Sequence, residues 1–159
     1  MRVEILSDQE VQVFLTYLDK CPARDALLMR FMLQAGLRVG EVKNANIEHV
    51  WRGGQVNPAI YLPQSTTKNH TARYVDMPAP LRSLVASYIG ELSRRSGYPD
   101  PCSPVFFSAL TKKRIGVRII QLITAAISTS ALGRPIHPHV LRHTYATTLL
   151  RYTNIKVVQ

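Results

Sequence analysis

A chain of 159 residues is long enough to form one domain around a single hydrophobic core. Its hydrophobic content of 46% excludes a disordered chain, and 20 Lys and Arg against 10 Asp and Glu give a net charge of +10. This excess favours a polyanionic partner, of which nucleic acid is the first candidate, over a basic surface that serves only solubility.

The sequence carries few signals of a membrane or secreted protein. No apolar run approaches the length of a membrane span, and no basic-then-apolar leader opens the chain. Cys21 and Cys102 are far apart in sequence, so they indicate neither a disulfide framework nor a pair of zinc ligands. We therefore expect a cytoplasmic protein without a membrane segment.

The first predicted elements are two helices. Ser7 and Glu10 have the spacing of a capping box at the start of the first helix. A second helix is expected between Pro22 and Gly36, where apolar residues are dense enough to predict a central buried helix.

Residues 36–42 read Gly-Leu-Arg-Val-Gly-Glu-Val. Gly36 can end the preceding helix in a left-handed conformation, and a short helix that holds Arg38 and Glu41 follows. Arg38 then lies beside a helix N-terminus, where backbone N–H groups attract anions, and Glu41 is placed to brace its guanidinium. An ordinary surface Arg–Glu pair is the alternative to a phosphate-binding site.

Residues 47–78 have a pattern typical of strands. Residues 47–51 run into the hairpin-turn signal Arg-Gly-Gly-Gln, and residues 59–63 and 73–77 predict two further strands of one small antiparallel sheet. The loop at residues 65–72 is polar and expected to be mobile, and a lysine within it, Lys68, is by itself no more than a solvated side chain.

Two longer helices are expected next. The first spans residues 80–95 and ends at Gly97, and the segment 105–107 is expected to be buried. The second follows a basic run and has an apolar face formed by Ile115, Ile119, Leu122, Ile123 and Ile127. The basic run, Lys112, Lys113 and Arg114, suits either a contact with DNA phosphates or mere solubility.

The last helix begins at Pro138, which suits the first helical turn. It places His139, Arg142 and His143 on one face, since they are three and four residues apart. A guanidinium beside an imidazole suits phosphate chemistry, because one holds the anion and the other moves a proton; a solvated surface helix is the alternative. The apolar side is expected to consist of Leu141, Tyr145, Ala146, Leu149 and Leu150.

Two of these segments, about a hundred residues apart, resemble boxes of the tyrosine recombinase (phage integrase) family. Residues 36–41 resemble its Gly-Leu-Arg-x-x-Glu box, and residues 138–147 resemble Pro-His-x-Leu-Arg-His-Thr-x-Ala-Thr. Residues 73–78 also fit the family's Arg-x-Val-x-x-Pro. The resemblance implies a mainly α-helical domain with a small antiparallel β-sheet (α+β) over residues 1–159. The family cuts and rejoins DNA through a 3′-phosphotyrosine, without a metal or other cofactor.

The resemblance also implies roles for individual residues. Arg38 and Arg142 would hold the non-bridging oxygens of the scissile phosphodiester. Lys68 would protonate the leaving 5′-oxygen, and His139 would exchange a proton with the attacking group. Supporting roles are expected for Glu41 and His143, and DNA contacts for Arg73, Lys112, Lys113 and Arg114.

We expect this domain to lack the family's N-terminal DNA-clamping domain and its nucleophilic tyrosine, which lies about thirty residues past the second arginine. Tyr145 and Tyr152 lie too close to Arg142 to be that nucleophile. We therefore expect the catalytic domain of a site-specific recombinase that is inactive alone. Its expected partners are double-stranded DNA and, in the complete protein, other protomers through C-terminal exchange.

Two other functions remain open. The chain could be a DNA-binding module without catalysis, for example a decoy that occupies recombination sites. The second alternative is a metal site built on His137, His139 and His143. No nearby cysteine or carboxylate completes such a ligand set.

Overall fold

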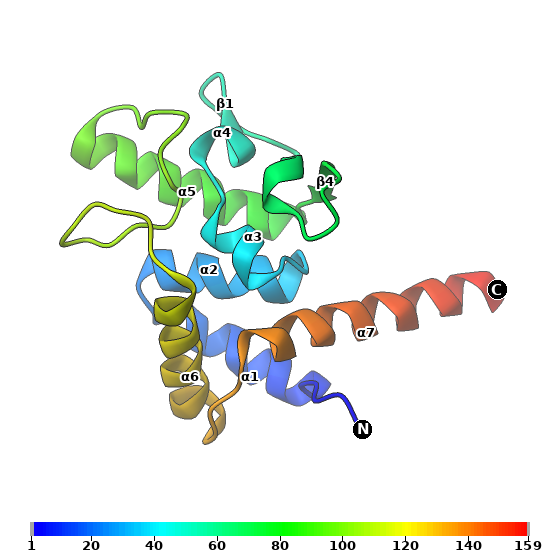
Figure 1. The fold of residues 1–159 in the computed structure, drawn as a ribbon. Coiled ribbons are helices and arrows are strands. Elements are labelled where there is room, and N and C mark those ends of the chain that lie inside the picture. Colours follow the sequence, from blue (N-terminus) through cyan, green and yellow to red (C-terminus); the bar gives the residue numbers. More distant parts are fainter. Residues whose placement is uncertain (1, 159) are drawn as a thin grey trace.

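The structure, a computed structural model, describes the backbone of residues 2–158 and the side chains of residues 2–154. Helices dominate it, and the short strands lie together on one side (Figure 1). The helices are α1 (Asp8–Leu18), α2 (Ala23–Gln34), α3 (Val39–Lys43), α4 (Ile47–Val50), α5 (Ala79–Ser96), α6 (Val117–Leu132) and α7 (Pro138–Val158). The strands are β1 (Trp51–Arg52), β2 (Gln55–Val56), β3 (Ala59–Leu62) and β4 (Arg73–Asp76), with a 3-10 turn, η1 (Gln64–Thr66), before β4.

Helix α2 is the central buried helix, as predicted. Every residue from 27 to 33 is buried, and α1, α3, α5 and α7 all pack against it. The ring of Phe31 meets that of Phe106 edge-on at 5.5 Å, which joins the helix to the buried segment before α6. Arg30 is buried too, and its guanidinium donates to Asp19 at 2.8 Å and to the Leu15 carbonyl at 3.3 Å.

The N-terminal segment is fastened at α1 and at α7. The predicted capping box is confirmed, because Glu10 N–H donates to Ser7 Oγ at 3.1 Å and Ser7 N–H donates to Glu10 Oε2 at 2.9 Å. One residue earlier, Leu6 N–H donates to the buried Thr144 hydroxyl on α7 at 2.9 Å. The Leu6–Thr144 bond holds the start of the chain against the helix that carries Arg142.

The strands form two sheets rather than the single expected one. Strand β1 pairs with β2 and β3 with β4, both antiparallel. The hairpin turn is confirmed, with positive φ angles of 59° at Gly53 and 78° at Gly54. Residues 47–50 are helical, which contradicts the expected strand, because Ile47 and Val50 are both buried at helical spacing.

The buried face of α6 differs from the predicted one. Ile119 and Leu122 are 45% and 50% exposed, whereas Ile120, Thr124 and Ile127 are buried. Ile115 and Ile127 of the expected face are buried, but that face did not include Ile120 or Thr124. Thr124 can be buried because its hydroxyl donates to the Ile120 carbonyl at 2.8 Å within the helix.

Helix α7 packs on the body only along its first half. Leu141 is fully buried, but Leu149 and Leu150 are 51% and 63% exposed, which corrects the expected apolar face. The second half extends away from the other helices (Figure 1). Along residues 2–158, no helix combines the length and the apolar character that crossing a membrane requires.

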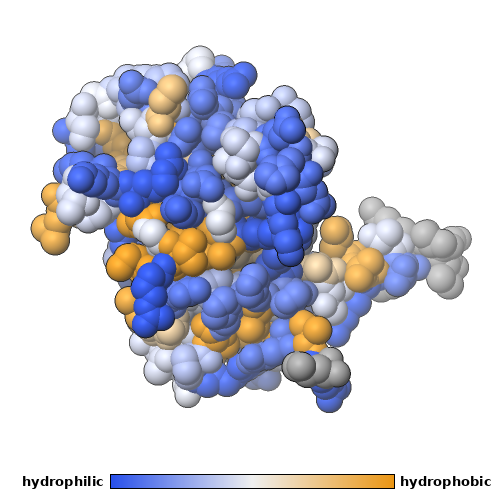
Figure 2. Space-filling model, in the orientation of Figure 1, coloured by the Kyte–Doolittle hydropathy of each residue, from blue (hydrophilic) through white to orange (hydrophobic). Residues whose placement is uncertain are grey.

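Hydrophilic residues cover most of the face that Figure 2 shows, and hydrophobic residues gather towards its middle and lower part, over the region of α6 and α1. Polar residues therefore cover most of this face of the helical core.

Candidate functional site

The turn between α2 and α3 places Arg38. Gly36 has a φ of 68°, and Leu37 N–H donates back to the Phe31 carbonyl at 3.1 Å, so the predicted left-handed helix end is confirmed. A Cβ atom on Gly36 would also collide with the ring of Tyr145. Glycine is thus required here both for its left-handed conformation and for the close approach of α7. The sequence predicted the first requirement but not the second.

Arg38 is the N-cap of α3, and Glu41 in the first turn binds it twice. Glu41 Oε2 accepts the backbone N–H of Arg38 at 2.8 Å, and Oε1 accepts from its guanidinium Nη1 at 3.3 Å. Glu41 is only 1% exposed, while the Arg38 side chain is 32% exposed. The predicted brace is therefore present, with a buried carboxylate behind a guanidinium that still reaches solvent.

Arg73 binds the same carboxylate from β4. Its Nη1 lies 2.8 Å from Glu41 Oε1, and its Nη2 donates to Oε2 at 3.1 Å. The two contacts form a bidentate arginine–carboxylate pair. The expected role of Arg73 was a direct DNA contact. That contact stays a prediction, and the pairing with Glu41 is an additional role that no local sequence signal indicates.

Arg142 joins this group from α7. Its guanidinium donates to the Gly36 carbonyl, two residues before Arg38. Burial lowers the pKa of Arg142, the positive charges of Arg38 and Arg73 lower it further, and Glu41 opposes them. The structure thus gathers Arg38, Glu41, Arg73 and Arg142, which we call the arginine site. Three guanidinium groups and one carboxylate give it a net charge of +2.

His139 lies one turn before Arg142 on α7, between two other histidines. Its ring centroid is 5.0 Å from that of His137 and 6.2 Å from that of His143. Burial lowers the pKa of His139, and the charges of His137, His143 and Arg142 lower it further. The lowered pKa favours the neutral form of the His139 imidazole, which is the form that accepts a proton. Within the described part of the chain, no three His, Cys, Asp or Glu side chains are arranged to hold a metal.

Lys68 is exposed at the tip of the loop between β3 and β4. The buried Thr67 hydroxyl closes this loop, since it accepts Thr71 N–H at 3.0 Å and donates to the Thr71 carbonyl at 2.9 Å. Among residues 2–154, Lys68 forms no hydrogen bond or ion pair with the arginine site. The loop ends at Arg73, however, so it leads directly into that site.

The basic run before α6 divides into two kinds of residue. Lys112 and Lys113 are exposed, as a DNA contact requires. Arg114 instead donates to the carbonyls of Lys43 and Ala45, at 2.8 and 3.2 Å, and to the Asn46 side chain. Burial lowers the pKa of Arg114. Its bonds to the end of α3 give it a structural role that the sequence did not predict.

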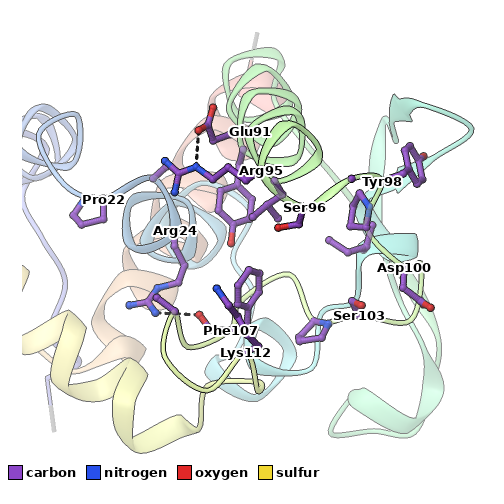
Figure 3. A pocket seen from close by; sticks show the side chains of 18 of the residues that line it. Pro22, Arg24, Glu91, Arg95, Ser96, Tyr98, Asp100, Ser103, Phe107 and Lys112 are labelled. Atoms are coloured by element: carbon purple, nitrogen blue, oxygen red, sulfur yellow. Dashed lines mark hydrogen bonds and ion pairs between the residues drawn. The ribbon is translucent and has the colours of Figure 1, made fainter.

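A pocket of about 910 Å³ lies elsewhere, between the start of α2, the end of α5 and the connection that follows α5 (Figure 3). Its charged walls pair among themselves, because Arg95 binds Glu91 at 2.8 Å and Arg24 binds Asp25 at 2.7 Å; Arg24 also donates to the Phe107 carbonyl at 3.1 Å. Burial raises the pKa of Tyr88, another wall residue, to about 12. No residue of the arginine site lines this pocket, so it is a separate feature.

The sequence is similar to that of tyrosine recombinases. Residues 4–159 match the sequence profile described as the phage integrase family. The tyrosine recombinase XerC of Vibrio vulnificus (strain YJ016) is 30% identical over 145 residues, which are 89% of this chain and 42% of that protein. XerD of Bifidobacterium longum (strain NCC 2705) is 27% identical over 138 residues, 84% of this chain and 43% of that protein. The chain spans about two fifths of the length of these curated relatives.

The fold is similar to that of solved recombinases. The crystal structure of XerA recombinase has a TM-score of 0.77 and 24% identity, over 96% of this chain and 52% of that one. The lambda integrase catalytic core has a TM-score of 0.61 and 16% identity, over 91% of this chain and 82% of that one. These likenesses confirm the predicted fold class, a mainly α-helical domain with small antiparallel sheets.

Proposed function

The chain belongs to the phage integrase family, and from that premise we propose that it is the catalytic domain of a site-specific tyrosine recombinase. In the complete enzyme this domain would bind double-stranded DNA, then cut and rejoin one strand through a 3′-phosphotyrosine. The similarity to XerC and XerD recombinases supports the proposal.

The observation that carries the proposal is the arginine site itself. A phosphodiester carries one negative charge and gains a second as its phosphorus becomes five-coordinate. A site with a net charge of +2, backed by a buried carboxylate, matches the charge of that transition state without a metal ion. Arg38 and Arg142 would each donate to a non-bridging oxygen, because each presents a planar fork of N–H groups.

Proton transfer would be divided between two residues. His139, whose surroundings lower its pKa and so favour the neutral imidazole, would take the proton of the attacking hydroxyl group. Lys68 would give a proton to the leaving 5′-oxygen once its loop closes on DNA. His143 would support His139 by holding its ring from the next turn of α7.

Binding would depend mainly on phosphates. The net charge of +10 and the exposed Lys112 and Lys113 would hold the duplex while the arginine site engages one phosphate. Neighbouring protomers would be the second class of partner, as in the lambda integrase tetramer bound to a Holliday junction. We place this activity in the cytoplasm, in keeping with two free cysteines.

The proposal is tested by binding of a fluorescent duplex to the 159-residue chain at 50 and 200 mM salt. We expect weak binding that falls at least tenfold over this range, because phosphate contacts release counterions. Arg142→Gln should weaken binding about tenfold, whereas Arg94→Gln, which breaks an exposed pair with Glu91, should change it far less. A wild-type chain that does not bind duplex DNA at low salt would contradict the proposal.

A further inference from the structure

Glu41 is fully engaged by its partners. A carboxylate offers about four lone-pair positions, and Arg73, the Arg38 side chain and the Arg38 backbone use them all. Because the carboxylate is buried, water cannot easily replace a partner that is lost. The two contacts with Arg73 form a bidentate pair, whereas the Arg38 side chain contributes one longer bond of 3.3 Å.

Arg73 is also the anchor of the loop that carries Lys68. It is the first residue of β4 and pairs with Leu62 at the end of β3, so it closes the segment 63–72. Among the described residues of this segment, only Thr67 has a buried hydroxyl, and its hydrogen bonds with Thr71 hold the loop together. The Arg73–Glu41 pair therefore ties the end of the Lys68 loop to the carboxylate that braces Arg38.

We propose that Arg73 is a positioning residue, which acts through Glu41 to orient Arg38 towards the phosphate and to fix the end of the loop that presents Lys68. This inference rests on the proposed function for the roles of Arg38 and Lys68. Arg73 balances most of the negative charge of Glu41. The guanidinium of Arg38 therefore donates only one N–H to the carboxylate and keeps its other N–H groups for DNA. Without Arg73, the buried carboxylate would draw Arg38 inward and compete with the phosphate.

The bidentate geometry of the Arg73–Glu41 pair makes the positioning role specific for arginine. A lysine at position 73 would keep the positive charge but could not match both carboxylate oxygens with one planar group. Arg73→Lys should therefore fall between the wild type and Arg73→Gln in every measurement below. It also provides a variant that leaves no buried charge unpaired, in case Arg73→Gln is too unstable to study.

The first test needs no DNA. NMR hydrogen exchange reports the amide of Thr71, which donates to the Thr67 hydroxyl, and that of His70, which donates to the Thr67 carbonyl at 3.2 Å. Arg73→Gln should accelerate their exchange about tenfold relative to amides of α2, and Arg73→Lys less. The control Arg94→Gln removes an exposed arginine of another pair and should leave them unchanged. Unchanged protection of both amides in Arg73→Gln would overturn the positioning role.

The second test asks whether Arg73 works through Arg38. Duplex affinity is measured for Arg38→Gln, Arg73→Gln and the double variant. If each single change costs about tenfold, independent contacts would give about a hundredfold loss in the double variant, whereas a shared role gives about tenfold. A hundredfold loss would overturn the proposal, since Arg73 would then bind DNA by itself. Failure of the wild type to bind DNA would instead count against the proposed function, and the exchange measurement would still decide the role of Arg73.

Discussion

The ring of Tyr145 lies against Gly36, on the side of that residue where any other amino acid would carry its Cβ atom. These two residues are 109 positions apart (145 − 36), and their contact seats α7 on the end of α2. Arg142 lies on the same helix and binds the Gly36 carbonyl. Gly36 therefore determines two things. It sets where the chain turns into α3, whose N-cap is Arg38, and it sets where α7, which carries Arg142, packs against the body.

Gly36→Ala should destabilise the fold more than an ordinary helix-end substitution. The left-handed conformation alone costs about 1–2 kcal/mol for alanine, and the collision with Tyr145 adds about 1–3 kcal/mol. Gly133 is a matched control, because its φ is 75° but nothing lies within 4 Å of the position that an added methyl group would take. Urea denaturation should show a larger loss for Gly36→Ala than for Gly133→Ala. Equal losses would mean that the Tyr145 contact is unimportant.

The local features of the two boxes could be predicted from neighbouring residues, and the fold class followed from the family that the boxes resemble. The Ser7 capping box and the left-handed Gly36 follow from residues close together in sequence, and both are confirmed. The family, inferred from residues 36–41 and 138–147, is confirmed as well. Helix ends and motif spacing are visible in a sequence because neighbouring residues determine them.

Features that depend on distant partners were missed. No periodicity could show that Arg73 would meet Glu41, 32 positions away, or that Arg114 would meet the end of α3. Thr124 was not among the residues expected on the apolar face of α6, yet it is buried, with its hydroxyl satisfied inside its own helix. The exposed Leu149 shows the opposite error, since an apolar residue is buried only where the helix still touches the body.

Arg114→Ala should lower stability rather than only DNA affinity. The Lys43 carbonyl would lose this donor and the Ala45 carbonyl would keep only the N–H of Val105, at a cost of about 1–3 kcal/mol. Lys113→Ala is the matched control from the same basic run, and it should leave the free energy of unfolding unchanged within about 0.5 kcal/mol. Urea denaturation measures both variants. Equal stability of Arg114→Ala and the wild type would exclude the structural role.

Acid should destabilise the fold through His49. This residue is 5% exposed, and burial lowers its pKa, although the charge of Glu48 partly opposes the shift. The unfolded chain therefore binds the proton more readily, so stability is fully present above the unfolded pKa of about 6.5 and falls as the pH drops below it. Urea denaturation at pH 7.5 and 5.5 should show this loss, and His49→Gln should reduce it. A loss of the same size in His49→Gln would assign the effect to other groups.

The 159-residue chain alone should form no covalent adduct with DNA, because neither tyrosine of the described part of α7 can attack a phosphate held in the arginine site. The Tyr145 ring is packed against Gly36, and turning it out would unseat the helix. Tyr152 is exposed, but it follows Arg142 by ten residues, which is about 15 Å along a helix. In-line attack needs the phenolic oxygen about 3 Å from phosphorus.

The measurement uses a nicked DNA substrate that traps a covalent intermediate, incubated with this chain, denatured and separated on a gel. A full-length tyrosine recombinase on its own site is the positive control and should give a shifted protein–DNA band. We expect no such band from the 159-residue chain, although it should bind the same DNA before denaturation. A shifted band that disappears in Tyr152→Phe but persists in Tyr145→Phe would identify Tyr152 as the nucleophile.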